Sequence, residues 1–168
     1  SVAYFFFFFQ PKTPEELKAL PEDVNLLISG HNHRCLFFSF LHLRALNPGV
    51  RLMPIEQRLA ADNLADWIDG VDLLLDCSDN FAIRFALNRA SVTARIPLVS
   101  AAAIGYDGQL GSFDPRQSDS PCYHCLYGHG SEAELTCSEA GVVGPLAGLV
   151  GSLQALEALK LLAGFGEP

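Results

Sequence analysis

The apolar positions of this chain change their spacing along its length, and these changes mark the elements that we expect. Short apolar runs bounded by turn residues predict strands at 2–9, 24–29, 50–56, 71–76 and 96–100. The run at 71–76 is almost continuously apolar, which is typical of a strand covered on both faces. The sequence therefore predicts several buried strands rather than a helical bundle.

Helical patterns lie between and after these strands. We expect helices at 62–68 and at 81–94, and Asp79 or Asn80 can cap the second of them. The strand at 71–76, this second helix and the strand at 96–100 together imply a parallel crossover unit, which is right-handed by a strong rule. This part of the chain predicts an α/β fold with a mostly parallel, Rossmann-like sheet and flanking helices.

The period changes again after the strand at 96–100. Residues 103–106 and 109–113 flank Asp107-Gly108, a dipeptide suited to a tight turn, so we expect a β-hairpin here. A long helix is expected at 142–163, with Gly144, Gly148 and Gly151 three or four residues apart on one face. Because glycine weakens a helix, its repetition indicates close packing against another element, such as a second subunit. A core helix with small residues of no special role is the alternative.

The first 42 residues differ from the remainder. Thr13, Pro14 and Glu16 fit a capping box at the start of a short helix. The strand at 24–29 leads into Gly30-His31-Asn32-His33. We therefore divide the chain into an atypical segment, 1–42, and a domain at 43–168.

Composition narrows the class of protein. The net charge of −8 argues against a nucleic-acid partner, because binding to phosphates needs a basic face. Residues 2–9 are too few to span a bilayer and lack the features of a secretory signal, so we expect no membrane partner. Five cysteines without such a signal favour reduced thiols in the cytoplasm.

Three cysteines lie close together in the second half of the chain. Cys122 and Cys125 form a C-x-x-C pair, which can supply two thiolates to a zinc ion, whereas a closed structural site needs four ligands. His124 and His129 are substitutes at poor spacing, and a pair of reduced or redox-active thiols is the alternative. Cys137 precedes a glycine-rich helix start, which favours a reactive thiolate. The neighbouring acidic residues oppose it, and a buried spectator is equally compatible.

The segment 76–80, D-C-S-D-N, follows a buried strand and opens a helix. The carboxyl end of a parallel strand is where such sheets bind ligands. A carboxylate at Asp79 can hold magnesium on a nucleotide phosphate. The alternative is that Asp79 only caps the helix.

Four segments in order resemble the ThiF/MoeB/HesA adenylyltransferases, bacterial relatives of the ubiquitin-activating enzymes. They are D-C-S-D-N-F-A-I-R-F-A-L-N at 76–88, P-L-V-S-A-A-A-I-G-Y-D-G-Q-L at 97–110, P-C-Y-H-C-L-Y-G at 121–128, and the stretch 136–160 that begins T-C-S-E-A-G-V-V-G-P. The resemblance covers 43–168 and implies a Rossmann-like sheet, usually in a homodimer.

This resemblance also implies an activity. Such enzymes bind magnesium ATP and the Gly-Gly tail of a small ubiquitin-like sulfur carrier, for molybdopterin or thiamine synthesis, and form an acyl adenylate and pyrophosphate. Asp79 matches the family aspartate that contacts metal and phosphates, and Asn80 and Arg84 are implied to help bind the nucleotide. Cys122 and Cys125 match half of the family zinc site. Cys137 matches a cysteine that some members link covalently to the carrier.

The chain also departs from the family pattern. The glycine-rich G-x-G-G-x-G loop, the acidic ribose-binding residue, and the asparagine and arginine near the phosphates do not occur in residues 1–42, and the family's phosphate-contacting lysine falls at Cys35. We therefore expect an incomplete nucleotide site that lacks the amino-terminal βαβ unit, and half a zinc site, since the second C-x-x-C normally follows a segment like 164–167. A noncatalytic dimer or carrier-binding module on the same scaffold is the alternative function.

A different resemblance lies at 23–33. The sequence D-V-N-L-L-I-S-G-H-N-H is similar to the last metal-binding motif of the calcineurin-like metallophosphoesterases. His31 and His33 fall on the same side of an extended segment, where they could bind a metal. The upstream motifs of that family are not found in the 22 residues before it. An exposed polar turn after a strand is the other interpretation.

Overall fold

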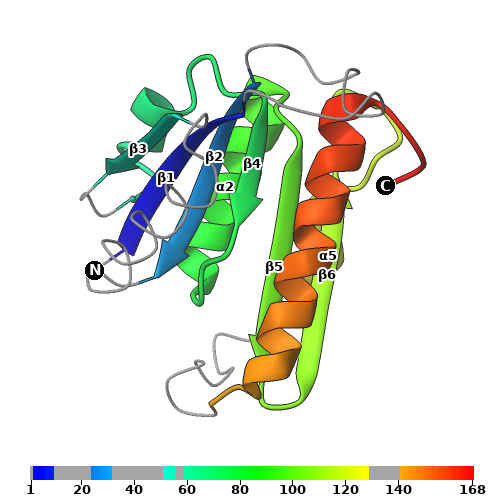
Figure 1. Ribbon diagram of the computed structural model, residues 1–168. Coiled ribbons are helices and arrows are strands. Elements are labelled where there is room, and N and C mark those ends of the chain that lie inside the picture. Colours follow the sequence, from blue (N-terminus) through cyan, green and yellow to red (C-terminus); the bar gives the residue numbers. More distant parts are fainter. Residues whose placement is uncertain (1, 10–23, 32–50, 56–58, 129–140) are drawn as a thin grey trace.

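The computed structural model describes residues 2–9, 24–31, 51–55, 59–128 and 141–168, which form a sheet with helices on both faces (Figure 1). The six strands are β1 (Val2–Phe9), β2 (Val24–His31), β3 (Arg51–Ile55), β4 (Leu73–Asp76), β5 (Leu98–Ile104) and β6 (Asp107–Phe113). The helical elements are η2 (Leu64–Trp67), α2 (Phe81–Ala94), α3 (Tyr123–Tyr127) and α5 (Gly144–Ala163). The expected α/β class is confirmed.

The sheet has the strand order β3-β1-β2-β4-β5-β6. Its three central strands, β2, β4 and β5, are parallel, and the flanking strands are antiparallel to their neighbours. In register, Ser29 of β2 lies beside Asp76 of β4, which lies beside Ser100 of β5. The carboxyl ends of three parallel strands therefore meet at one edge of the sheet, and β1 and β2 extend the same sheet.

The two faces of the sheet are covered by different helices. Side chains alternate along β4 and β5, so Leu74 and Leu98 pack with Leu87 of α2 on one face. Leu73 and Val99 pack on the opposite face, which α5 covers. Figure 1 shows α2 behind the sheet and α5 in front of β5 and β6. The strand predicted at 71–76 is found as Leu73–Asp76, and its predicted cover on both faces is confirmed, since all four of its residues are buried.

Two local predictions were wrong in detail. The helix expected at 62–68 is a four-residue 3-10 turn, Leu64–Trp67, in which the Asn63 side chain accepts a hydrogen bond from the Ala60 amide. Asparagine competes with the backbone in this way and so favours turns over helix interiors. The hairpin exists, but its turn is Gly105-Tyr106 rather than Asp107-Gly108, because Ile104 already pairs with Asp107.

Helix α2 begins and ends where the sequence predicted. Asn80 is its N-cap, with an extended backbone and a side-chain oxygen that accepts from the Ile83 amide at 3.0 Å. The parallel unit of β4, α2 and β5 is confirmed as well. The right-handedness of this unit stays a prediction.

Helix α5 packs on the sheet with one face and leaves the other exposed. Val150, Gln154 and Ala158 are buried. The glycines at 144, 148 and 151 point away, and an added Cβ at any of them would meet no atom within 4 Å. The close backbone packing expected of these glycines is therefore not formed within the described part of the chain. By length and composition alone, α5 could also cross a membrane, and a core helix passes the same test.

Several predicted features lie outside the described residues. These are the capping box at Thr13, His33, Cys35, His129 and Cys137.

Candidate functional site

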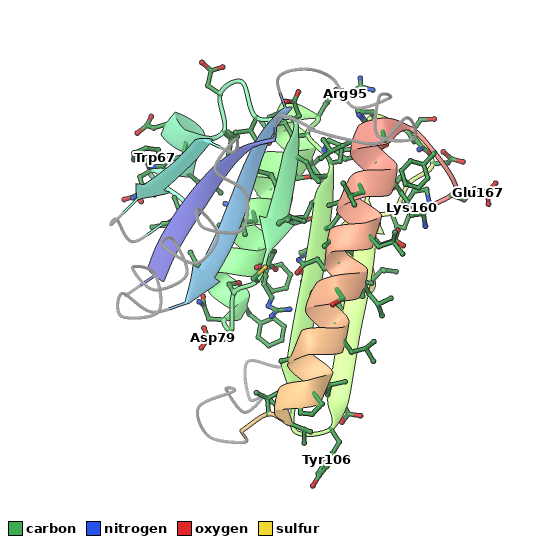
Figure 2. The ribbon with its side chains drawn as sticks, viewed as in Figure 1. Trp67, Asp79, Arg95, Tyr106, Lys160 and Glu167 are labelled. Atoms are coloured by element: carbon green, nitrogen blue, oxygen red, sulfur yellow. The ribbon has the colours of Figure 1, made fainter. Side chains whose placement is uncertain are left out.

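The loop between β4 and α2 is held by several buried hydrogen bonds. It runs from Cys77 to Asn80 at the edge where the three parallel strands end, and Figure 2 marks Asp79 there. Asp79 is half-buried. Its neighbour Asn80 caps α2, since the Asn80 side-chain oxygen accepts a hydrogen bond from the Ile83 amide.

A buried carboxylate anchors this loop from below. Asp76, the last residue of β4, is 0% exposed. Its Oδ1 accepts from the Ser78 amide at 3.0 Å and from the Ser78 hydroxyl at 2.6 Å, and its Oδ2 accepts from the Ser100 hydroxyl at 2.7 Å. Hydrogen bonds of this kind stabilise a buried charge. The loop is therefore tied both to its own strand and to β5.

Arg84 of α2 completes the cluster. Its guanidinium donates to the Ser78 carbonyl and, at 3.5 Å, to the Ala101 carbonyl, and its Nε lies 4.0 Å from Asp76 Oδ2. The residue is 7% exposed. Arg84 thus donates its hydrogen bonds to carbonyl groups inside the protein. Its predicted contact with nucleotide stays a prediction, to which these geometric facts lend no support.

The opposite face of the sheet holds a second polar contact to the same loop. Gln154 of α5 is 4% exposed and donates through Nε2 to the carbonyls of Asp76, at 2.9 Å, and Val99, at 3.0 Å. Its Oε1 accepts from the Cys77 thiol at 3.3 Å. Although Cys77 exposes part of its surface, its sulfur faces this buried amide. Desolvation, and secondarily the Asp76 charge, raise the pKa of the Cys77 thiol to about 12. Cys77 is therefore a protonated donor at neutral pH.

This cluster could not be found by local sequence reasoning. Asp76 and Asp79 stand in the same D-C-S-D-N string, yet Asp76 is fully buried and Asp79 is only half-buried. Ser100 and Gln154 were not predicted as site residues. Each is a polar residue in a segment expected to be buried: Ser100 in the strand predicted at 96–100, and Gln154 in the apolar helix predicted at 142–163.

The C-x-x-C pair forms a separate feature at the start of α3. Cys122 is the N-cap of this helix, and its Sγ lies 3.4 Å from that of Cys125. Asn88 of α2 holds the turn, because its Oδ1 accepts from the Tyr123 amide and its Nδ2 donates to Cys122 Sγ at 3.7 Å. Desolvation raises the pKa of Cys122, but hydrogen bonds from Cys125, Asn88 and backbone amides outweigh it, and the net shift is downward.

The sulfur separation can be compared with a zinc site. Two thiolates on a tetrahedral zinc with Zn–S bonds of about 2.3 Å lie about 3.8 Å apart, so the observed pair needs to open only slightly. Among the residues that the structure describes, however, no group of three His, Cys, Asp or Glu side chains is placed to hold a metal. The described part of the chain offers two ligands and no third.

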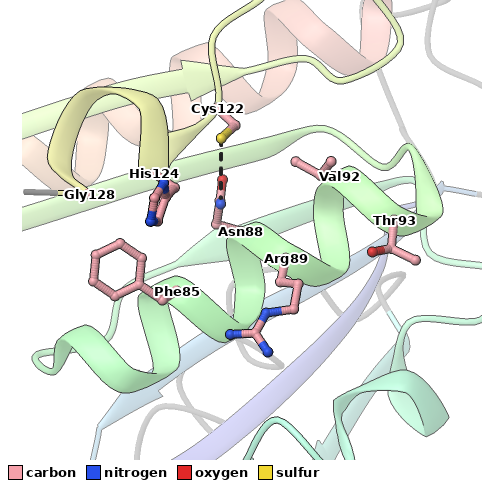
Figure 3. A pocket seen from close by; sticks show the side chains of 8 residues that line it. All are labelled: Phe85, Asn88, Arg89, Val92, Thr93, Cys122, His124 and Gly128. Carbon is pink, nitrogen blue, oxygen red and sulfur yellow. Dashed lines mark hydrogen bonds between the residues drawn. The ribbon is translucent and has the colours of Figure 1, made fainter.

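An open groove lies beside this pair, on the outer side of α2 (Figure 3). It has a volume of about 670 Å³. The lining side chains come from α2, α3 and the residue that caps α3: Phe85, Asn88, Arg89, Val92, Thr93, Cys122 and His124, with Gly128. Asp79 is not among them, so the groove and the Asp79 loop are separate regions.

Comparison with known proteins agrees with the family resemblance of the sequence motifs. A family model described as the ThiF family matches residues 40–168. The molybdopterin-synthase adenylyltransferase of Salmonella typhimurium is 47% identical over 126 residues, which are 75% of this chain and 50% of that protein. The sulfur carrier protein ThiS adenylyltransferase of Escherichia coli is 44% identical over 126 residues, with the same shares. The chain thus spans about half the length of these curated relatives.

Solved structures resemble the fold. A crystal structure of Escherichia coli MccB with ATP superposes with a TM-score of 0.54 at 18% identity, over 67% of this chain and 35% of that chain. A second one, with selenomethionine MccA, gives a TM-score of 0.56 at 19% identity, over 68% and 36%. At such identities the likeness concerns the fold alone, and it confirms the Rossmann-type arrangement.

Proposed function

The chain belongs to the ThiF family, and we propose that it takes part in the ATP-dependent adenylylation of a small ubiquitin-like sulfur-carrier protein. The observation that carries this proposal is the position of Asp79. It stands half-buried at the edge where the carboxyl ends of β2, β4 and β5 meet, on a loop held from both faces of the sheet. That edge is where open α/β sheets bind their ligands. The adenylyltransferase names of its relatives support the same reaction.

The chemistry assigns a definite task to this carboxylate. The carrier's terminal carboxylate attacks the α-phosphorus of ATP; a P–O bond forms, the bond to the pyrophosphate oxygen breaks, and an acyl adenylate and pyrophosphate result. Negative charge builds up on the leaving pyrophosphate, and a magnesium ion, if bound there, would offset this charge. Asp79 is the residue that would hold this ion, since carboxylate oxygen is the ligand that magnesium prefers. Its partial exposure leaves it accessible for that contact.

A second candidate function rests on β2. In the family a glycine-rich loop that cradles phosphates precedes the matched part, whereas β2 here ends in Gly30-His31 and the chain continues Asn32-His33. Backbone amides of such a loop are a main source of phosphate affinity. With this sequence at the strand end, the scaffold could bind the carrier without activating it. The resemblance of 23–33 to a phosphoesterase motif has gained no further support.

The test is equilibrium binding of magnesium ATP by isothermal titration calorimetry, followed by carrier-dependent exchange of pyrophosphate into ATP. We expect Asp79→Asn to abolish the gain in ATP affinity that Mg²⁺ gives. Asp119→Asn, an exposed residue outside the loop, is the matched control and should leave it unchanged. No ATP binding by the native chain, together with measurable binding of a Gly-Gly carrier, would establish the second candidate instead. Efficient exchange by the chain alone would show that our picture of an incomplete nucleotide site is wrong.

A homodimer through the outer face of α5 is part of this proposal. Leu149, Leu153 and Leu156 are 58%, 43% and 47% exposed, and the adjacent glycines leave open space for a close approach. We expect a dimer by sedimentation equilibrium and a shift toward monomer for Leu153→Ser. Val92→Ser, at a residue of α2 that is 46% exposed, is the control. A native chain that stays monomeric at high concentration contradicts this part.

Zinc binding is the remaining part of the proposal. Cys122 and Cys125 would supply two thiolates, and the other two ligands would come from outside the described residues. Cobalt is a suitable probe, because thiolate ligation gives it a charge-transfer absorption. Cys122→Ser should remove this absorption, and Cys77→Ser, whose sulfur faces Gln154, should not. Cys137 is the proposed covalent acceptor of the carrier, because its thiolate could displace AMP from the acyl adenylate and form a thioester. This part is tested separately by a thioester adduct that Cys137→Ser loses.

A further inference from the structure

The segment from the end of β4 to Asp79 is held by polar contacts from two directions. On the α2 face, the Asp76 carboxylate receives the Ser78 amide and the hydroxyls of Ser78 and Ser100. On the α5 face, the Gln154 amide reaches the same strand end. Each set is buried, and the two lie on opposite sides of the sheet.

Gln154 makes the more unusual of these contacts. β4 ends at Asp76, so the carbonyl of this residue is at the end of its hydrogen-bonded ladder. The side-chain amide of Gln154 supplies a donor to it and a second donor to the Val99 carbonyl of the adjacent strand. The side chain therefore bridges β4 and β5 where β4 gives way to the loop. Its oxygen also accepts a hydrogen bond from the Cys77 thiol, so both its donor and its acceptor groups are engaged.

This bridge lies only a short distance before Asp79 in the chain. Cys77 and Ser78 are the two residues between the bridge and Asp79, and each is fixed, one to Gln154 and the other to Asp76. Arg84 fixes the Ser78 carbonyl as well. A carboxylate that must meet a metal ion needs a backbone held to within a fraction of an ångström. The hydrogen bonds of Cys77 and Ser78 hold the backbone before Asp79 in one position, as such precision requires.

We propose that Gln154 is a positioning residue for adenylylation, which acts through the Asp76–Ser78 turn to set the place of the Asp79 carboxylate. Asp76 and Ser100 form the other half of this device, on the α2 face. The inference rests on the proposed function in assigning a task to Asp79. The fixing of the loop itself does not depend on that assignment.

The first test measures loop order in the free chain, without any ligand. Residue-resolved amide hydrogen exchange by NMR follows the Ser78 amide, which is protected by its bond to Asp76 Oδ1. In Gln154→Met, which keeps the volume and loses the hydrogen bonds, we expect this amide to exchange at least about tenfold faster. The control is Val150→Ala, one turn earlier on the same buried face of α5, whose side chain packs near β6. The control should alter exchange near Gly108 and leave Ser78 unchanged.

The second test separates positioning from a general structural role. ATP dissociation constants are measured with and without Mg²⁺ for the native chain and both variants. Loss of positioning at Asp79 reduces the gain that Mg²⁺ gives, whereas a general structural lesion weakens ATP binding in both conditions. We expect the gain to fall about tenfold in Gln154→Met and to persist in Val150→Ala.

The outcomes are distinguishable. Equal exchange at Ser78 in the two variants overturns the positioning role, whatever the nucleotide results. A second outcome combines two results: Ser78 exchanges faster in Gln154→Met but not in Val150→Ala, and the native chain binds no ATP. This outcome supports the fixing of the loop and defeats the proposed function. An unchanged Mg²⁺ gain in Gln154→Met, in a chain that does bind ATP, overturns the link from Gln154 to Asp79.

Discussion

Replacing Asp76 with asparagine removes the charge at the centre of the buried cluster while keeping its shape. The first effect is on hydrogen bonding. Three donors, the Ser78 amide and the hydroxyls of Ser78 and Ser100, point at two carboxylate oxygens, and an amide presents one oxygen and one donor in their place. One buried donor thereby loses its acceptor, at a cost of about 1–3 kcal/mol.

The second effect concerns Arg84. Its buried guanidinium loses the opposite charge whose Oδ2 lies 4.0 Å from its Nε. Breaking a buried ion pair costs about 3–5 kcal/mol when the remaining charge is left without compensation. Here the guanidinium still donates to the carbonyls of Ser78 and Ala101, and the pair is at the long end of the contact range. We therefore take a loss of about 3 kcal/mol in the free energy of unfolding as the expected total.

Urea denaturation can measure this value, because Trp67 is the single tryptophan and packs against the main core cluster. Asp119→Asn, an exposed site, is the control and should change the free energy of unfolding by less than about 0.5 kcal/mol. The double variant Asp76→Asn/Arg84→Met should lose less than the sum of the two single variants, since it leaves no lone charge. A loss below about 1 kcal/mol for Asp76→Asn, or strict additivity, would refute the reasoning.

Three further outcomes are expected. Asn80→Ala should cost about 1 kcal/mol by urea denaturation, because it removes the N-cap of α2, and Asn80→Asp should retain most of it; equal losses would contradict the cap. Gly105→Ala should cost about 1–2 kcal/mol, because Gly105 has φ +55°; Gly144→Ala, at a helical glycine with open space around it, is its control. The raised pKa of Cys77 means that the folded state keeps the thiol proton above the ordinary value of 9.0, up to about 12. Its contribution is present below pH 9 and is lost as the pH rises toward 12, so the urea midpoint should fall between about pH 9 and 11 more in the native chain than in Cys77→Ser.

The elements predicted well are those whose signals are local. The apolar run at β4, the cap at Asn80 and the helix after it are consecutive in the chain, and each agrees with its neighbours. The hairpin shows where local signals fail. Asp107-Gly108 is a stronger turn dipeptide than Gly105-Tyr106, but the Gly105 amide and carbonyl bond to Gly141 and Val143. These contacts come from the start of α5, and they place the turn two residues earlier than the dipeptide suggests.

The candidate site divides in the same way. Asp79 was predicted because it follows a buried strand and matches a family motif, and both facts can be read within a few residues. Ser100 lies 24 positions from Asp76, and Gln154 lies 78 positions from it. A buried polar residue on an apolar helix indicates that a partner exists, but the strand register and the packing of α5 decide which partner it is. Sequence reasoning therefore pointed to Asp79, the residue for which we propose contact with a ligand, and missed the residues that hold its loop.

Helix α5 connects two parts of the proposal, because we assign different tasks to adjacent residues on its two faces. Leu153 is 43% exposed on the face assigned to a second copy, and Gln154 is 4% exposed against the strand ends. If the faces act independently, Leu153→Ser changes the oligomeric state and leaves amide exchange at Ser78 unchanged. Gln154→Met then speeds exchange at Ser78 and leaves the oligomeric state unchanged. If Leu153→Ser also loosens Ser78, dimerisation itself stabilises the Asp79 loop through α5, and the order of that loop would depend on protein concentration.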